Sequence, residues 1–170
     1  MRIAIAASLL VLAIAGFSAS PAPAQEPVII TPEQVGQIFC IARTGNDMAP
    51  VEGLKSEDLR IAIEIAEQQN AVWEEANPGE KPPLGDGIPW QTAPDYADTC
   101  TVGAVTYEMD RATVRIDYAF AQYPEANFSD RLALKLETLM EGDSPRWRID
   151  NVVYADDGDL RTVLLGAFAN

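Results

Sequence analysis

The sequence predicts an α+β domain, because its first half has the periodicity of helices and its second half has the periodicity of strands. Apolar residues recur every three or four positions over residues 31–44 and 56–76, whereas from Thr101 onward they alternate with polar residues. The predicted order is two helices, a long loop, four antiparallel strands that form one curved sheet, and a short C-terminal helix. We expect the helices to pack on the apolar face of that sheet.

The first helix is predicted to begin after Thr31. Thr31 can cap its N-terminus, Pro32 suits the first helical position, and Gln34 completes a capping box with Thr31. Gly45 is the expected stop. The buried stripe of this helix is predicted to contain Val35, Ile38, Phe39 and Ala42.

The second helix is predicted to begin after Ser56. Glu57 and Asp58 suit the positive end of its dipole, and Asn77-Pro78-Gly79 ends it. Its broad apolar face contains Leu59, Ala62, Ile63, Ala66, Val72, Trp73 and Ala76.

Residues 77–99 form a long connection that five prolines stiffen. Loops of this length are uncommon in a compact domain unless they cover a site. Trp90 and Tyr96 lie in it among aspartates, so we expect them to contact a ligand, together with Tyr107 and Tyr118 from the strands. Alternatively, the loop is a surface segment whose aromatic side chains seal one end of the core, and the tyrosines pack in the core or at its rim.

The strands are predicted over residues 101–109, 112–122, 130–140 and 146–154, with a hairpin turn at Asp110-Arg111. Alternation gives each strand one apolar and one charged face. Three strand carboxylates, those of Asp117, Glu137 and Asp150, are candidates for a buried general base. The alternative is that they pair with Arg and Lys on a solvated sheet face. The final helix is predicted to bury Leu160, Val163, Leu164, Ala167 and Phe168.

Residues 1–24 have the features of a cleavable signal peptide. Arg2 precedes an apolar run from Ile3 to Phe17, and Ala22-Pro23-Ala24 matches the small-x-small pattern that signal peptidase recognises. An uncleaved anchor is the alternative, but the run is shorter than the roughly 20 residues that span a bilayer. We therefore expect residues 25–170 to form one domain that is exported to the periplasm or secreted, with no membrane span.

Charge and composition exclude several classes of function. The net charge of −14 opposes binding to nucleic acid, which depends on Lys and Arg that neutralise phosphates. The chain has no histidine, which excludes Ser-His-Asp and Cys-His catalysis and removes the commonest zinc ligand. Asp156, Asp157 and Asp159 precede a helix without the spacing of a calcium loop. We expect no metal, no cofactor and no catalytic residue of the familiar types.

Cys40 and Cys100 are the only cysteines. Because exported proteins meet an oxidising compartment, we expect them to form a disulfide. The chain-entropy treatment gives such a bridge about 4 kcal/mol of stabilisation. Two buried thiols are the alternative.

Several segments of the chain resemble bacterial exported proteins with a nuclear-transport-factor-2-like fold. They are Thr31-Pro32-Glu33, the run Leu132–Leu136, Trp147-Arg148-Ile149-Asp150, Val152-Val153-Tyr154 and Asp159-Leu160-Arg161. The resemblance implies a curved sheet wrapped around helices to form a cone, and pairing of two copies through the sheet face. That fold often has three helices before the sheet, whereas two are evident here. We therefore expect extra helical turns in the long connection over residues 77–99.

The function that these observations favour is an exported, non-enzymatic binding or interaction module. Its cone cavity or sheet face would engage a small molecule or an envelope protein. Enzymes with the nuclear-transport-factor-2-like fold typically pair an Asp with a His or a Tyr. Because this sequence has no histidine, we assign no catalytic residue from the resemblance. The alternatives are a small isomerase or dehydratase that uses a buried carboxylate and a tyrosine, and a periplasmic inhibitor or immunity-type protein.

Overall fold

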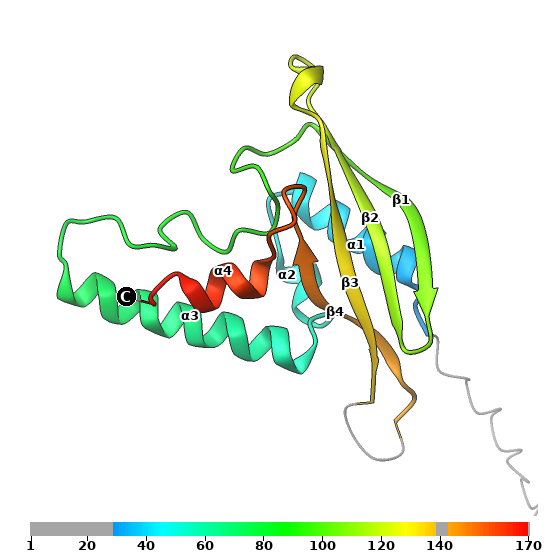
Figure 1. Cartoon of the computed structure of the whole chain (residues 1–170), viewed down its shortest axis with the longest axis horizontal. Coiled ribbons are helices and arrows are strands. Elements are labelled where there is room, and N and C mark those ends of the chain that lie inside the picture. Colours follow the sequence, from blue (N-terminus) through cyan, green and yellow to red (C-terminus); the bar gives the residue numbers. More distant parts are fainter. Residues whose placement is uncertain (1–28, 139–142, 170) are drawn as a thin grey trace, which may run out of the picture.

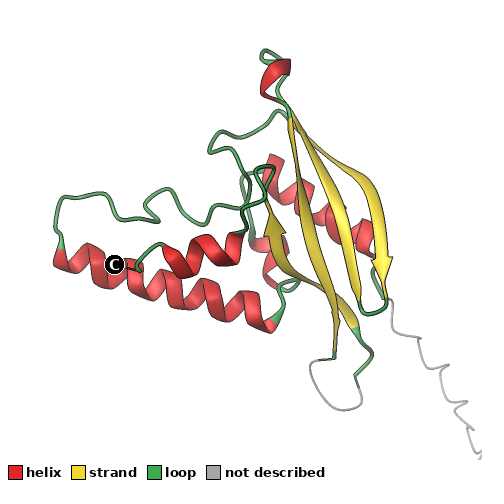
Figure 2. Ribbon diagram, viewed as in Figure 1, coloured by secondary structure: helices red, strands yellow, loops and turns green. Residues whose placement is uncertain are grey.

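The computed structural model describes residues 29–138 and 143–169 (Figure 1, Figure 2). The predicted signal peptide lies outside the described residues. The elements are α1 (Pro32–Thr44), α2 (Ala49–Glu52), α3 (Glu57–Ala76), β1 (Thr99–Glu108), β2 (Arg111–Ala119), the short 3-10 turn η1 (Pro124–Ala126), β3 (Phe128–Glu137), β4 (Arg146–Val153) and α4 (Leu160–Gly166). The strands form one antiparallel sheet in the order β1-β2-β3-β4, which confirms the α+β prediction.

Helix α1 lies across one face of the sheet (Figure 1). Its start is the predicted capping box, in which Thr31 Oγ1 accepts a hydrogen bond from the Gln34 amide and Gln34 Oε1 accepts one from the Thr31 amide. Gly36 allows the close approach, since a Cβ there would lie 2.9 Å from Val114 Cγ1. The space between α1 and the sheet is filled by side chains at most 1% exposed, those of Val35, Phe39, Val114, Ile116, Leu132 and Leu134.

Helices α3 and α4 run side by side as an arm that extends from the β4 edge of the sheet (Figure 1). Just before α3, Leu54 and Ser56 exchange backbone hydrogen bonds with Ile149 of β4, at 2.7 and 2.8 Å. Ser56 then caps the helix by accepting a hydrogen bond from the Leu59 amide. Leu59 and Leu160, both fully buried, join the arm to the core. The loop over residues 77–98 returns along the arm to β1.

Two details of the predicted order differ from the structure. A four-residue helix, α2, lies between the two predicted helices. It is too short to show a periodicity, and no side chain caps it. Conversely, the described loop 77–98 contains turns but no helix, so the extra helical turns expected there are absent. The strand boundaries also move by a few residues, and β2 ends at Ala119 rather than at residue 122.

The charged face of the sheet is only partly solvated. Arg115 and Asp117 form an exposed ion pair at 2.9 Å, as predicted. The alternative of a solvated face is wrong for Asp150, which is 8% exposed, because the first turn of α3 covers this end of β3 and β4. Asp150 Oδ1 accepts a hydrogen bond from Ser56 Oγ at 2.8 Å and lies 3.4 Å from Lys135 Nζ. Asp150 therefore helps to fasten the arm to the sheet.

Candidate ligand-binding site

A disulfide connects α1 to the first residues of β1. The Cα atoms of Cys40 and Cys100 are 5.1 Å apart, and the predicted bridge is confirmed. Because Cys100 directly follows loop 77–98, the bridge fixes the end of that loop against α1.

The second part of the loop, residues 83–96, is fastened to three elements. The side chain of Asp130, at the start of β3, accepts hydrogen bonds from the amide and the hydroxyl of Thr92. The Tyr154 hydroxyl donates to the Pro89 carbonyl at 2.6 Å, and Asn70 of α3 accepts a hydrogen bond from the Leu84 amide at 2.9 Å. This segment, which we call the docked loop, therefore has a defined conformation without regular secondary structure.

Asp130 is the most deeply buried carboxylate of the described residues, with no exposed surface. Burial raises its pKa above the usual 3.8, and the hydrogen bonds from Thr92 and the Ala155 amide partly offset this rise. Because the pKa of Asp130 is higher in the folded protein than in the unfolded chain, protonation of Asp130 stabilises the fold. This stabilisation is fully present at pH values below the unfolded-state pKa and is lost as the pH rises through the folded-state pKa.

We expect Thr92→Val to raise the pKa of Asp130 further, because it removes a hydroxyl that stabilises the ionised form. The midpoint can be followed through the carboxyl carbon by NMR. Thr162→Val is a matched control, since that hydroxyl donates to Asp159 instead. An Asp130 midpoint at or below the usual value in the wild type, or one that Thr92→Val lowers, would contradict this description of the docked loop.

Two cavities lie against the docked loop. One, of about 450 Å³, lies toward α3 and includes Lys55, Arg60 and Glu64 in its wall. The other, of about 460 Å³, lies toward α4 and includes Val163 and Ala167. Both volumes are in the range of small-molecule pockets. The wall that the two cavities share contains Arg43, Asp86, Gly87, Ile88, Trp90 and Tyr96.

Arg43 is the positively charged residue of this shared wall. It comes from the last turn of α1 and is 8% exposed. Its Nε and Nη2 donate to Gln91 Oε1 at 3.1 and 2.7 Å, and its guanidinium carbon lies 5.0 Å from the centroid of the Tyr96 ring. Gln91 is itself held by the carbonyls of Ala93 and Asp95. The docked loop thus fixes the guanidinium in place.

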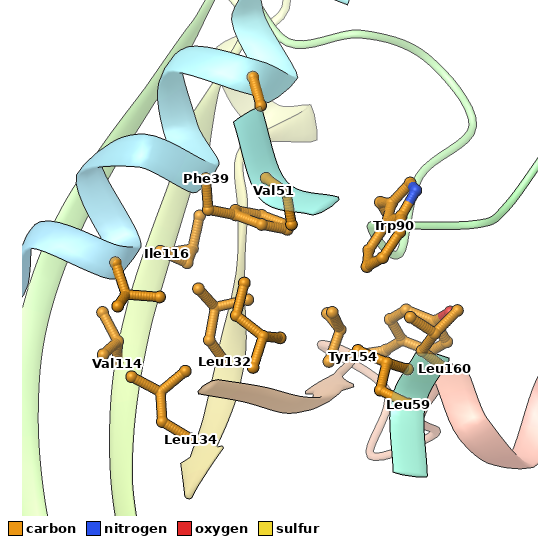
Figure 3. Packing of buried hydrophobic residues seen from close by; sticks show 14 of the residues in the cluster. Phe39, Val51, Leu59, Trp90, Val114, Ile116, Leu132, Leu134, Tyr154 and Leu160 are labelled. Carbon is orange, nitrogen blue, oxygen red and sulfur yellow. The ribbon is translucent and has the colours of Figure 1, made fainter. Parts of the chain in front are cut away.

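Of the four aromatic residues predicted to contact a ligand, the structure brings Trp90 and Tyr96 to this site. Trp90 is 6% exposed and packs edge-on against Phe39, with the ring centroids 6.4 Å apart. Figure 3 shows its ring pointing from the loop into the core above Tyr154. Trp90 therefore seals the core as well as lining the cavities, whereas Tyr96 is 53% exposed.

The structure does not bring Tyr107 and Tyr118 into either cavity. Tyr118 is buried, its ring stacks on Phe128 at 4.6 Å, and burial raises its pKa. Its hydroxyl has no hydrogen-bond partner among the described residues. Tyr107 is exposed, and its hydroxyl donates to Glu33 at the first turn of α1. Tyr107 packs along the sheet away from the docked loop, whereas the buried Tyr118 hydroxyl lies near Arg43 and Asp130 without lining either cavity.

Sequence reasoning missed Arg43 and Asp130, although each left a signal. Asp130, Leu132 and Leu134 are spaced two positions apart, so their side chains lie on the same face of the strand. This spacing places a carboxylate on the inward face. A carboxylate there needs buried partners. Arg43 is a basic residue in the last turn of a helix, where the dipole alone explains a positive charge, so its signal was weaker.

A separate apolar surface lies on the outer side of α3. Ile65 and Val72 are 41% and 68% exposed, and with Trp73 and Phe168 they line a groove of about 580 Å³. Among the described residues, no charged side chain lines this groove. It is a second place where an apolar molecule could bind, and experiments on the docked loop need a control for it.

In the described part of the chain, no helix is both long enough and apolar enough to cross a membrane. Within the same residues, no group of three or more Cys, Asp or Glu side chains is arranged to hold a metal ion.

No protein family matches this chain, and neither a curated protein nor a solved structure matches it.

Proposed function

We propose that this protein is an exported, non-enzymatic binding module with a nuclear-transport-factor-2-like fold, and that it holds a small molecule beside the docked loop. The observation that carries the proposal is a loop fastened to α3, β3 and the end of β4 that still leaves two cavities against it. Pockets that are formed before the ligand arrives bind without the entropic cost of ordering a loop.

The disulfide and the shape of the sheet support the other parts of the proposal. A bridge between Cys40 and Cys100 is expected to persist in an oxidising compartment, which agrees with export. A twisted sheet that packs around α1 agrees with the proposed fold (Figure 2). The filled space between α1 and the sheet is the reason why we place the ligand at the docked loop rather than in a cone.

An enzyme of the isomerase or dehydratase type is the alternative, and it would need a carboxylate that reaches the substrate. Asp130 is buried, and its charge acts on the hydroxyls of Tyr118 and Tyr154. However, Asp130 has no exposed surface, and its oxygens accept hydrogen bonds from Thr92 and Ala155. That arrangement favours a structural role for Asp130 and binding without chemistry at the docked loop.

Native mass spectrometry tests the proposal. We expect the protein, purified without reductant from the cell that exports it, to show a mass excess that denaturation removes. That excess would identify the class of the bound compound. A clean mass in the native state, together with no binding of added aromatic or aliphatic probes, would contradict the proposal.

A further inference from the structure

We infer that the ligand is a small organic monoanion with an apolar body, whose acidic group pairs with Arg43 and whose body lies in the cavity toward α4. This inference deepens the proposed function and rests on it.

Arg43 carries a positive charge in a buried position. Among the described residues it is one of two buried arginines that form no ion pair, and the other, Arg148, lines neither cavity. Arg43 donates instead to the neutral amide of Gln91. A buried charge without an opposite charge is costly. An anion beside Arg43 would remove that cost.

The other cations in these walls already have partners. Lys55 pairs with Glu52 at 2.7 Å, and Arg60 pairs with Glu57 and Glu64. Asp86, the one carboxylate that lines the cavity toward α4, lies 2.5 Å from Lys81. Among the described residues, the wall carboxylate Glu67 has no ion pair, and of the two cavities it lines only the one toward α3. Arg43 is therefore the cation left for a ligand, and a single cation suits a single acidic group.

The guanidinium of Arg43 has more donors than its neighbours use. Gln91 accepts two of its five N–H donors and the Tyr118 hydroxyl lies near the group, so donors remain for a carboxylate or sulfonate. The ring of Tyr96 covers it at 5.0 Å and limits its movement. The donors are thus oriented before a ligand binds, which favours recognition of a planar acidic group.

The two cavities differ in the polarity of their walls. The one toward α4 is the more apolar, with walls from Leu84, Ile88, Pro94, Val163 and Ala167. The one toward α3 carries the ion pairs of Lys55 and Arg60. An apolar body gains more from the first cavity, since it displaces water from apolar walls and leaves the ion pairs hydrated.

A pair of fluorescent probes tests the inference. 8-Anilinonaphthalene-1-sulfonate and N-phenyl-1-naphthylamine share the same aromatic body, and only the first carries an anionic group. We expect the wild type to bind the sulfonate at least about tenfold more tightly than the neutral probe, because a charge-assisted hydrogen bond has that effect. This comparison uses only the wild-type protein, so its result does not depend on whether a variant folds.

Arg43→Gln should weaken binding of the sulfonate about tenfold or more and leave the affinity for the neutral probe almost unchanged. Arg43→Lys should keep part of the preference for the anion. Arg131→Gln is the matched control, because it removes a cation that is already paired with Asp157 and that lines neither cavity, and it should change neither affinity. A cooperative thermal transition of each variant shows that it is folded.

Two further variants locate the probes. Ala167→Phe should weaken both probes by filling the cavity toward α4, whereas Val72→Ser, in the groove on α3, should weaken neither. If the two probes bind with equal affinities that Arg43→Gln does not change, the inference of an anionic ligand is wrong. The proposed function is not affected by that result. Binding of neither probe, or binding that only Val72→Ser removes, would overturn the proposed function and the inference with it.

Discussion

Replacing Cys40 and Cys100 together by alanine should lower the free energy of unfolding by about 4 kcal/mol. The two cysteines are 60 positions apart in the sequence, so the bridge removes a large amount of conformational freedom from the unfolded chain. Chemical denaturation of the oxidised wild type and of the double variant, followed by circular dichroism, measures the difference.

Reductant provides the internal control for this prediction. It should destabilise the wild type by a similar amount and leave the double variant unchanged. Equal unfolding midpoints for the oxidised and the reduced wild type would contradict a stabilising role for the bridge. A loosened bridge should also free the end of the docked loop, because Cys100 lies only four positions after it.

Trp90→Ala should destabilise the protein by about 3–5 kcal/mol, the usual cost of truncating a buried tryptophan. Tyr96→Ala should cost far less, since Trp90 is 6% exposed and Tyr96 is 53% exposed. The sequence alone predicted that both side chains contact a ligand. The structure adds a second role for Trp90, whose ring packs against Phe39 in the core.

Urea denaturation of both variants measures this contrast. Trp90→Phe is the matched control, because it keeps an aromatic ring against Phe39 and should recover much of the loss. Similar stabilities for Trp90→Ala and Tyr96→Ala would show that the Trp90 ring does not seal the core. Loss of probe binding in Trp90→Ala must be interpreted together with its stability, whereas loss in Tyr96→Ala reports on the site itself.

Local signals in the sequence were sufficient for the helix starts and the strand order. The capping box of Thr31 and Gln34 and the cap of Ser56 each depend on residues within one turn, and both are present. The alternation in β2, which buries Val114, Ile116 and Tyr118, likewise depends only on neighbours along the chain. Such features can be predicted because their physical causes lie a few residues apart.

The site depends on contacts between residues that are distant in the sequence. Arg43 meets Gln91 across 48 positions, and Asp130 meets Thr92 across 38. No periodicity shows that a loop folds back onto both groups. The sequence could identify the loop by its prolines and aromatic residues, but not the arginine beside which it docks.

The strand carboxylates illustrate the same limit. Asp117 pairs with an exposed Arg115, whereas Asp150, which lies at a bulge between β3 and β4, is buried against Ser56. Ser56 is 94 positions from Asp150, and the α3 turn that it caps covers one end of the sheet only. Which part of a charged face stays in water is decided by the packing of the helices, not by the strand pattern.

The most direct test of the docked loop as a ligand site is native mass spectrometry of the wild-type protein beside two variants of α4. Ala167→Phe projects a ring into the cavity toward α4, whereas Leu165→Phe places the same ring at a position that is 58% exposed. We predict a mass excess in the wild type and in Leu165→Phe that is lost in Ala167→Phe. An excess of equal size in all three proteins would place the ligand elsewhere on the molecule and contradict the site.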